Sequence, residues 1–283
     1  MNAMHIPEDW RDAARRIERS RKGRILIIGA PDRGKSTFCA YLSWFLLRHG
    51  HQPAYVDADI GQKDIGPPAT ISLGYPNLDQ ALATLPVSAL YFVGAVSPLG
   101  HLLPMVVGTR KLAEQAGKPF VLINTSGLVA GVGEVLKTFQ IDSLQPDLIV
   151  TLEQDRELEA IVAAHRHFPI VRLASSPLVQ SKSMELRHQR RLAAFRYYFR
   201  HARLRHVALQ DLILQRLPVE GYRPREEIFT LNRLCALADR QQQVLGLALI
   251  RGYDDHHRTI TLYSPVRESC PVLQLGDLHL ELA

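Results

Sequence analysis

The sequence predicts an α/β fold in which helices flank a mainly parallel sheet and a small β-rich module follows. Up to about residue 175, short apolar runs alternate with longer segments of helical periodicity. The polar motifs of this part each follow an apolar run, as expected at the carboxyl edge of a parallel sheet. After about residue 205, apolar and polar residues alternate, which is typical of strands.

The predicted elements follow one another closely along the chain. An arginine-rich amphipathic helix is predicted at residues 8–22, and a buried strand at 24–29 leads into a glycine-rich loop. A helix then runs from 35 to Gly50, which ends it. Further strands are predicted at 53–59, 89–94, 119–125, 147–152 and 168–173. Helices near 101–117, 133–144 and 155–166 separate most of these strands.

These elements divide the chain into three parts. Residues 1–23 contain the N-terminal helix, residues 24–204 form the main domain, and residues 205–283 form the β-rich module. Within the module, strands at 243–253 and 258–266 are joined by the turn DDHH, and the C-terminal segment VLQLGDLHLEL alternates like a further strand.

Composition places the chain among ordinary cytoplasmic globular proteins. It is 46% hydrophobic and 22% charged, which excludes a disordered chain. No apolar stretch is long enough to cross a bilayer, so no membrane association is predicted. The three cysteines are far apart and lack metal-ligand spacing, which indicates a reducing compartment. A net charge of +6 is compatible with a polyanionic partner, and no particular protein partner is indicated.

The segment GAPDRGKST matches the G-x-x-x-x-G-K-[ST] phosphate-binding loop. The strand before it and the helix after it are the context that this motif requires, which argues against a chance match in a turn. In such a loop, Lys35 bridges the β- and γ-phosphates, Ser36 ligates Mg²⁺ and Thr37 reaches the α-phosphate. The predicted cofactors are ATP, or GTP, with Mg²⁺. The predicted nucleotide-binding residues are Gly29, Ala30, Pro31, Asp32, Arg33, Gly34, Lys35, Ser36 and Thr37.

Two acids follow the next predicted strand, in the segment VDADIGQ. Asp57 and Asp59 are two residues apart, so in an extended chain both side chains point the same way, toward the phosphate edge. One carboxylate near Mg²⁺ can hold a metal-bound water, and the other can accept a proton from an attacking hydroxyl. The alternative is a solvated strand end. Gln62 is a candidate for orienting the substrate.

The segment NTSGLVAG follows another apolar strand. Asn124, Thr125 and their neighbours offer polar groups at the same edge of the sheet. The segment is not the Asn-Lys-x-Asp base-reading motif of many GTPases. A plain strand-to-helix turn accounts for it equally well.

Residues 181–205 form a predicted amphipathic helix with an unusual charge. Eight lysines and arginines stand against one acid, and Phe195 and Phe199 lie on an apolar face. Arg187 and Arg191 share one face of this helix. A solvated basic helix is the alternative, but repulsion between like charges is relieved when phosphates bind. The pattern therefore predicts a lid at about residues 178–204 that supplies an arginine to a transition state or contacts a nucleic acid backbone.

In this order, GAPDRGKST, VDADIGQ with GPPATISLG, NTSGLVAG and the arginine-rich segment ending FRYYF resemble the motifs of the P-loop polynucleotide 5′-hydroxyl kinases. This family includes RNA 5′-kinases of tRNA and rRNA processing and of the mRNA 3′-end cleavage complex. The tail of the chain resembles their C-terminal β-module, so the resemblance covers about residues 5–283. It implies a P-loop NTPase fold, a kinase domain at 24–204, and transfer of a γ-phosphate to 5′-hydroxyl ends of RNA or DNA.

The resemblance also implies roles for single residues. Asp59 would activate the 5′-hydroxyl, and Lys35 with Arg187 or Arg191 would stabilise the transferred phosphoryl group. The residues implied to hold Mg²⁺ are Ser36, Asp57 and Asp59. The residues implied to line the groove for the nucleic acid strand are Gln62, Asn124, Thr125 and Leu128.

Two departures from the family pattern affect these expectations. The family usually has a tryptophan where this chain has Leu128, so stacking on a base is lost or supplied elsewhere. Eukaryotic members carry an extra N-terminal β-domain, whereas about 23 residues precede the first strand here, which indicates the compact prokaryotic form. Two other classes stay open: a non-catalytic ATP-binding scaffold in RNA processing, and a regulatory P-loop GTPase.

Overall fold

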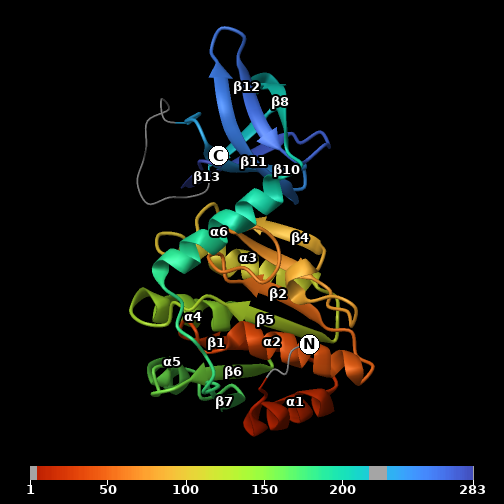
Figure 1. The fold of residues 1–283 in the computed structure, drawn as a ribbon, viewed down its shortest axis with the longest axis vertical. Helices are drawn as coiled ribbons and strands as arrows, with labels where there is room; N and C mark the ends of the chain where they lie inside the picture. Colours follow the sequence, from red (N-terminus) through yellow and green to blue (C-terminus); the bar gives the residue numbers. More distant parts are fainter. Residues whose placement is uncertain (1–4, 217–227, 283) are drawn as a thin grey trace.

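The computed structural model describes residues 5–216 and 228–282. Residues 217–227, in the predicted C-terminal module, lie outside the described residues, as do 1–4 and 283. The thirteen described strands form one continuous sheet in the order β7-β6-β1-β5-β2-β3-β4-β11-β10-β13-β9, and β12 joins β11 to β8 (Figure 1). The main domain and the β-rich module therefore share a single sheet.

Five strands of the main domain are parallel and carry the predicted pattern. In the sheet they lie in the order β7-β6-β1-β5-β2. Their bounds are β1 Gly23–Gly29, β2 Ala54–Ala58, β5 Phe120–Thr125, β6 Leu148–Glu153 and β7 Ile170–Ala174. β1, β2 and β5 are buried almost throughout because helices cover both faces of the sheet. The predicted mainly parallel α/β sheet is confirmed.

The sequence pattern did not predict β3, which spans Thr70–Gly74. This strand is antiparallel to β2 and to β4, Val87–Phe92. Thr70 and Ser72 interrupt its apolar run, although both are fully buried. The Thr70 hydroxyl donates to the Pro67 carbonyl at 2.7 Å, so the burial of this polar group is satisfied locally.

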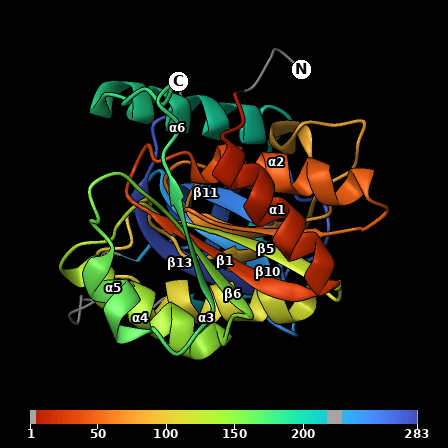
Figure 2. The ribbon, with the colours of Figure 1, turned by 90° about the horizontal axis from the view of Figure 1, so that it is seen from below.

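Helices cover the two faces of the main sheet (Figure 2). One face carries α1, Glu8–Ser20, and α2, Lys35–Arg48. The other carries α3, Leu102–Gln115, α4, Val132–Leu144, and α5, Glu159–Ala164. Two single 3₁₀ turns, η1 at Leu82–Thr84 and η2 at Leu209–Asp211, lie in connections. Each predicted helix is present, and α5 is shorter than expected.

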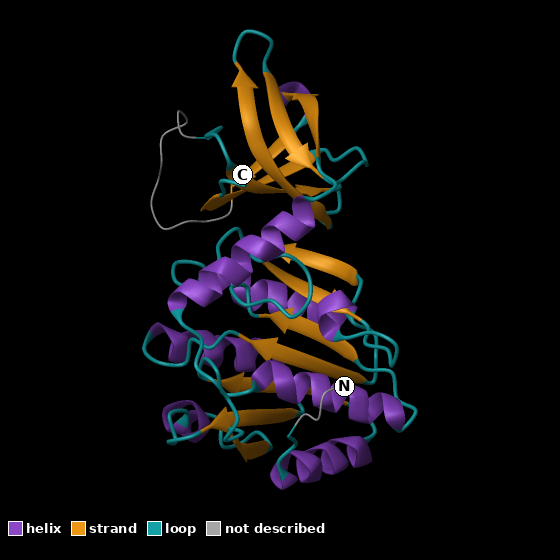
Figure 3. Ribbon diagram, viewed as in Figure 1, coloured by secondary structure: helices purple, strands orange, loops and turns teal. Residues whose placement is uncertain are grey.

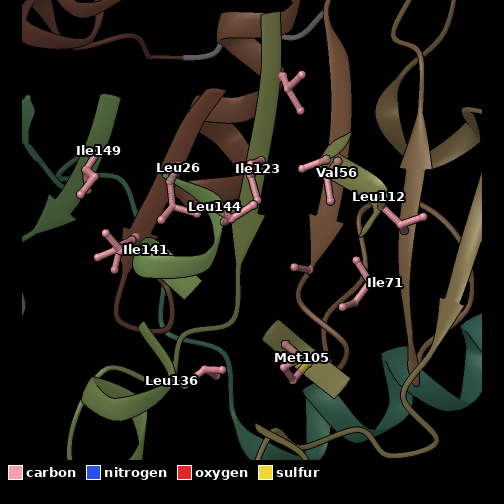
Figure 4. Packing of buried hydrophobic residues seen from close by; sticks show 14 of the residues in the cluster. Leu26, Val56, Ile71, Met105, Leu112, Ile123, Leu136, Ile141, Leu144 and Ile149 are labelled. Carbon is pink, nitrogen blue, oxygen red and sulfur yellow. The ribbon is translucent and has the colours of Figure 1, made fainter. Parts of the chain in front are cut away.

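Two hydrophobic clusters lie on opposite sides of the parallel strands. Alternate residues of a strand face opposite sides, so Leu26 belongs to the cluster under α3 and α4 while Ile27 belongs to the cluster under α1 and α2. In Figure 4, Leu136 and Met105 approach the strand residues from α4 and α3. Each such fully buried side chain contributes about 2 kcal/mol, which fixes the strand ends that carry the polar motifs.

The lid helix is shorter than predicted. α6 spans Met184–Phe199, and Arg203 and Arg205 belong instead to a strand, β8, Arg203–Ala208. The helix ends where Phe199 is buried, and the Ala202 N–H then bonds the Phe199 carbonyl. The segment RLRHVA alternates with a period of two and pairs with β12, and this pairing overrides the helical continuation.

The C-terminal strands confirm a β-rich module. They are β9 Ile213–Arg216, β10 Arg233–Ala238, β11 Val244–Asp254, β12 Thr259–Ser264 and β13 Val272–His279. β10, β11, β12 and β13 pair antiparallel. The module meets the main domain where Val244 of β11 pairs with Leu90 of β4. Figure 3 shows that the module consists mainly of strands and loops. α6 lies across this junction, with its C-terminal end against the module (Figure 1).

Candidate active site

One cavity of about 640 Å³ lies at the carboxyl ends of β1, β2 and β5, where parallel sheets bind their ligands. Its size is in the range of small-molecule sites. The walls come from the phosphate loop, the segments that follow β2 and β5, and the start of α6. The predicted site residues in its lining are Pro31, Asp32, Arg33, Gly34, Lys35, Ser36, Thr37, Asp59, Gln62, Leu128, Arg187 and Arg191.

The phosphate loop ends on a glycine that no other residue could replace without strain. Gly34 has φ +91°, and a Cβ built there would lie 3.2 Å from the buried ring of Trp10. α2 starts at the next residue, and no side chain caps its first turn. The uncapped N–H groups and the positive end of the helix dipole therefore face the cavity, an arrangement that favours a phosphate.

Lys35 lies at the base of this loop and is only 7% exposed. Its Nζ donates to the carbonyl oxygens of Gly29 at 2.8 Å and of Ala30 at 2.9 Å. Burial lowers the pKa of Lys35, and the negative charge of Asp59 opposes this shift. Gly29 and Ala30 therefore contribute to the site by holding the lysine, and they do not line the cavity themselves.

Asp59 lines the cavity with one carboxylate oxygen fixed. Its Oδ1 accepts the backbone N–H groups of Gly61 at 3.0 Å and Gln62 at 2.9 Å. No residue in the described ranges bonds its Oδ2. The backbone thus orients the carboxylate while one oxygen stays able to accept a proton.

Asp57 does not line the cavity, although the two-residue spacing predicts that it faces the same way as Asp59. Its buried carboxylate accepts the N–H groups of Asp64 at 2.7 Å and Ile65 at 3.2 Å, and it pairs with Lys63 at 3.2 Å. Burial raises the pKa of Asp57, and the ammonium of Lys63 opposes this rise. The carboxylate closes the turn after β2, because the chain leaves the extended conformation there.

A third acid that the sequence analysis missed, Asp64, lies beside the phosphate loop. Its carboxylate accepts a hydrogen bond from the Tyr55 hydroxyl at 2.5 Å and from the Asn124 amide at 3.2 Å. Burial raises the pKa of Asp64 to about 6, and the nearby charge of Asp57 adds to this rise. The available signal was an acid two residues beyond the motif VDADIGQ.

The oxygen atoms around Ser36 fit a magnesium ion. Ser36 and Asp59 line the same cavity, and the Ser36 hydroxyl is close enough to Asp64 to lower the pKa of that acid. Mg²⁺ in nucleotide sites takes one or two protein oxygens and completes its shell with phosphates and water. The described part of the chain holds no cluster of three or more His, Cys, Asp or Glu that could hold a metal ion.

The polar residues at the end of β5 act inside the protein. Asn124 donates to Asp57 at 3.4 Å as well as to Asp64, and Thr125 donates to the Ile27 carbonyl at 2.8 Å. Both are buried and neither lines the cavity. They align β5 with its neighbouring strands, so the groove expected along them is formed by the residues that follow.

Ser126, Gly127 and Leu128 form the cavity wall after β5. A Cβ on Gly127 would lie 2.7 Å from the backbone nitrogen of Pro31, so only glycine lets this turn lie against the phosphate loop. Leu128 is half-buried in the wall. We call residues 126–128 the β5 turn.

The lid meets the phosphate loop through Asp32. The Arg187 guanidinium and the Lys182 N–H, the latter at 3.0 Å, both donate to the Asp32 carboxylate. The Gln62 side chain also donates to the Arg187 carbonyl at 3.2 Å. Arg191, one helical turn further on, lines the cavity beside Arg187. Four segments that are distant in the sequence therefore converge on one site.

Arg33 has a further role that the motif did not predict. Its guanidinium pairs with Glu157 at 2.6 Å, after β6. Burial disfavours the charged carboxylate, but Arg33 and three backbone N–H groups outweigh it and hold the pKa of Glu157 down at about 2. The side chain of Arg33 thus fastens the phosphate loop to the neighbouring strand end.

None of the helices in the described ranges is both long enough and apolar enough to cross a bilayer. The three cysteines are buried and unpaired.

Comparison with known proteins agrees with this geometry. Residues 29–201 match the family model described as mRNA cleavage and polyadenylation factor CLP1 P-loop. A polyribonucleotide 5′-hydroxyl-kinase of Pyrococcus furiosus is 38% identical over 74% of this chain and 60% of its own length. One of Methanocaldococcus jannaschii is 33% identical, over 74% and 59%. The chain thus spans about three fifths of the length of these relatives.

A solved structure has the same fold. Clp1p, in a complex with Pcf11p, superposes with a TM-score of 0.73 at 15% identity, over 95% of this chain and 78% of that one. With a family model that matches from the phosphate loop through the lid, the chain belongs to the CLP1 P-loop family.

Proposed function

We propose that this chain is a polynucleotide 5′-hydroxyl kinase, which transfers the γ-phosphate of ATP or GTP to the 5′-hydroxyl end of RNA or DNA. The observation that carries this proposal is the unpartnered Oδ2 of Asp59, in one cavity with the phosphate loop. The printed names of relatives at 33–38% identity, polyribonucleotide 5′-hydroxyl-kinases, support RNA as an acceptor.

The transfer needs positioning and charge neutralisation more than covalent chemistry. The 5′-hydroxyl oxygen attacks the γ-phosphorus as its proton passes to Oδ2 of Asp59, and the nucleoside diphosphate leaves. The N-terminus of α2 and the ammonium of Lys35 stabilise the negative charge of the phosphates. Arg187 and Arg191 line the same cavity from α6 and neutralise charge on the transferred group.

The metal site of this proposal follows from the oxygen ligands of the cavity. Ser36 would hold Mg²⁺ beside the carboxylate of Asp59, which keeps its Oδ2 for the proton, and the ion would supply positive charge to the phosphates. Asp57 keeps the turn after β2 folded, so that Asp59 faces the loop.

The outer face of α6 supports a polynucleotide rather than a small hydroxyl compound as acceptor. Arg190 and Arg196 are exposed, and neither forms an ion pair with a described residue. Tyr197 is 66% exposed, and the guanidinium of Arg200 stacks 3.7 Å from its ring centroid. Unpaired cations next to an exposed aromatic ring suit the phosphates and bases of a strand.

The deciding experiment is transfer of label from γ-labelled ATP, with Mg²⁺, to matched 5′-hydroxyl RNA and DNA oligonucleotides of several lengths. We expect label on the 5′ end of at least one substrate and none on the same oligonucleotides bearing a 5′-phosphate. The 5′-phosphorylated strands control for labelling elsewhere. Tight binding of an ATP analogue without any transfer would favour the scaffold alternative, and strict GTP hydrolysis without transfer would favour the GTPase.

A further inference from the structure

A buried lysine under the β5 turn has no acid to neutralise it. Lys137 of α4 is fully buried, next to the apolar Leu136 of the cluster in Figure 4. Its Nζ has two neutral partners, the Ser126 hydroxyl and the Gln140 amide oxygen, each at 3.4 Å. No ion pair within the described ranges includes it. Burying an ammonium without a counter-charge costs free energy. If the lysine had no function, an apolar residue would be expected at this position.

The neighbours of Lys137 are arranged to accept its hydrogen bonds. The Thr109 hydroxyl donates to the Met105 carbonyl at 2.6 Å, so it can only accept from the Gln140 amide, at 3.3 Å. This fixes the orientation of the amide and turns its oxygen toward Lys137. A chain of contacts from α3 through α4 therefore aims the amine at Ser126, which lines the cavity.

The charged groups that act on Lys137 belong to the nucleotide site. Burial lowers the pKa of Lys137 to about 7, the positive charge of Lys35 lowers it further, and the carboxylate of Asp59 opposes both. The two residues that bond it, Ser126 and Gln140, are neutral, and so is Thr109 of α3, which bonds Gln140. Near neutral pH the amine thus gains or loses a proton easily, and an added negative charge in the cavity favours the protonated form.

We propose that Lys137 is a positioning residue of the nucleotide site, which takes up a proton when a nucleoside triphosphate binds and holds Ser126 beside the phosphate loop. The proposal rests on the nucleotide site of the proposed kinase, but not on the acceptor. The proton comes from solvent and is released with the nucleotide. By reciprocity, the triphosphate binds more tightly to the protonated form, so its affinity falls as pH rises above neutrality.

Calorimetry of the wild-type protein tests this directly. A non-hydrolysable ATP analogue with Mg²⁺ is titrated at about pH 8 in two buffers that differ in ionisation enthalpy. We expect net uptake of a fraction of a proton, and a dissociation constant that rises several-fold between about pH 7 and about pH 9. Binding of the analogue without proton uptake would overturn the proposal, and so would an affinity that is independent of pH.

Two variants test whether Lys137 is the group that takes up the proton. Lys137→Met keeps the volume of the side chain and removes the titration, so proton uptake should disappear and the affinity should no longer depend on pH. Lys137→Gln repeats the test with a hydrogen-bond donor retained toward Ser126. Proton uptake that persists in a folded variant would show that another group takes up the proton, and it would refute the proposal. Because the readout is nucleotide binding, these experiments test the role of Lys137 whether or not any oligonucleotide is phosphorylated.

Discussion

Individual carboxylates at the site differ in how many of their oxygens the protein uses. Asp59 has one oxygen fixed by two backbone N–H groups and the other without a partner. Asp57 uses both oxygens on the backbone and on Lys63. In the proposed reaction, the role of base and the role of structural support thus fall to two acids that are only two residues apart.

Asp59→Asn should remove the transfer reaction. An amide cannot accept the proton of the 5′-hydroxyl, so we expect the rate of label transfer to fall by at least about a hundredfold. The amide oxygen can still accept the two N–H bonds, so affinity for an ATP analogue should stay within about threefold. Asp57→Asn is the matched control, with a lowered melting temperature as its main effect. If the Asp59→Asn variant transferred label at an undiminished rate, Asp59 would not be the base.

Lys137→Met should stabilise the free protein at neutral pH. The lysine has a folded pKa of about 7 and an ordinary value of 10.5. Between these values the unfolded chain binds the proton and the folded chain does not, so the free energy of unfolding of the wild type rises with pH. The variant should therefore melt several degrees higher near pH 7, and the difference should shrink toward pH 10. Thermal denaturation at both pH values measures it, and a variant less stable at pH 7 would contradict it.

Among the elements, the phosphate loop and α6 depend on one polar contact. The carboxylate of Asp32 accepts from the backbone of Lys182 and from the side chain of Arg187. The loop that is expected to bind the triphosphate therefore also orders the start of the lid.

Asp32→Asn should loosen the lid without emptying the nucleotide site. The loss of one charge-assisted hydrogen bond, about 1.5–3 kcal/mol, should raise the KM for ATP several-fold. Steady-state kinetics measures this change. Asp79→Asn, an exposed acid near η1, serves as the control and should leave KM unchanged. An unaltered KM in Asp32→Asn would show that the contact does not order the lid.

Neutralising the outer face of α6 should weaken binding of the strand but not of the nucleotide. In the double variant Arg190→Gln/Arg196→Gln, we expect oligonucleotide affinity to fall about tenfold at low salt, with a shallower salt dependence. The matched control, Arg16→Gln/Arg19→Gln on α1, changes the net charge equally at exposed positions. Fluorescence anisotropy of a labelled oligonucleotide measures both. Equal losses in the two double variants would refute a specific strand surface.

The elements best predicted from sequence are those with one unambiguous signal. β1 and α2 flank a glycine-rich loop that requires this order, and both lie where they were expected. β3 was missed because its buried hydroxyls look polar in sequence, yet the Pro67 carbonyl satisfies one of them. The C-terminal end of α6 was misjudged because arginines continue past it, and only pairing with β12 reveals a strand.

The candidate site also contains some residues that the sequence predicts and some that it does not. The phosphate loop and Asp59 follow from local patterns, and the structure brings them into one cavity. Asp64 and Lys137 could not be predicted, because their roles depend on contacts between elements that are far apart in sequence. Local spacing also predicted that Asp57 faces the phosphates, whereas its carboxylate is buried in the turn after β2 and does not line the cavity.

For the molecule as a whole, α6 joins the two parts of the continuous sheet. Phe195 and Phe199 are buried in a cluster that includes Phe92 of β4 and Leu247 of β11. The Tyr198 hydroxyl also accepts the Leu247 N–H at 2.8 Å. The position of the lid therefore depends on packing that the main domain and the module share.

Phe199→Ala should destabilise the protein and lower transfer together. Removing a fully buried phenylalanine costs about 3–5 kcal/mol, and the lid loses its support at the same time. Leu103→Ala on the exposed side of α3 is the control, with an expected effect below about 0.5 kcal/mol. Chemical denaturation and the labelling assay report the two effects. If a folded Phe199→Ala protein transferred label at the full rate, the position of the lid would not depend on this packing.

The unequal ends of α6 have a consequence for turnover. Near Phe199 the helix packs in an apolar cluster. Near Arg187 it is held to Asp32 and Gln62 by hydrogen bonds that water can replace. In the proposed kinase, release of the nucleoside diphosphate would therefore need only the Arg187 end of α6 to move, while the Phe199 end stays packed. Such a movement would break a few hydrogen bonds that water can replace and would expose almost none of the apolar cluster.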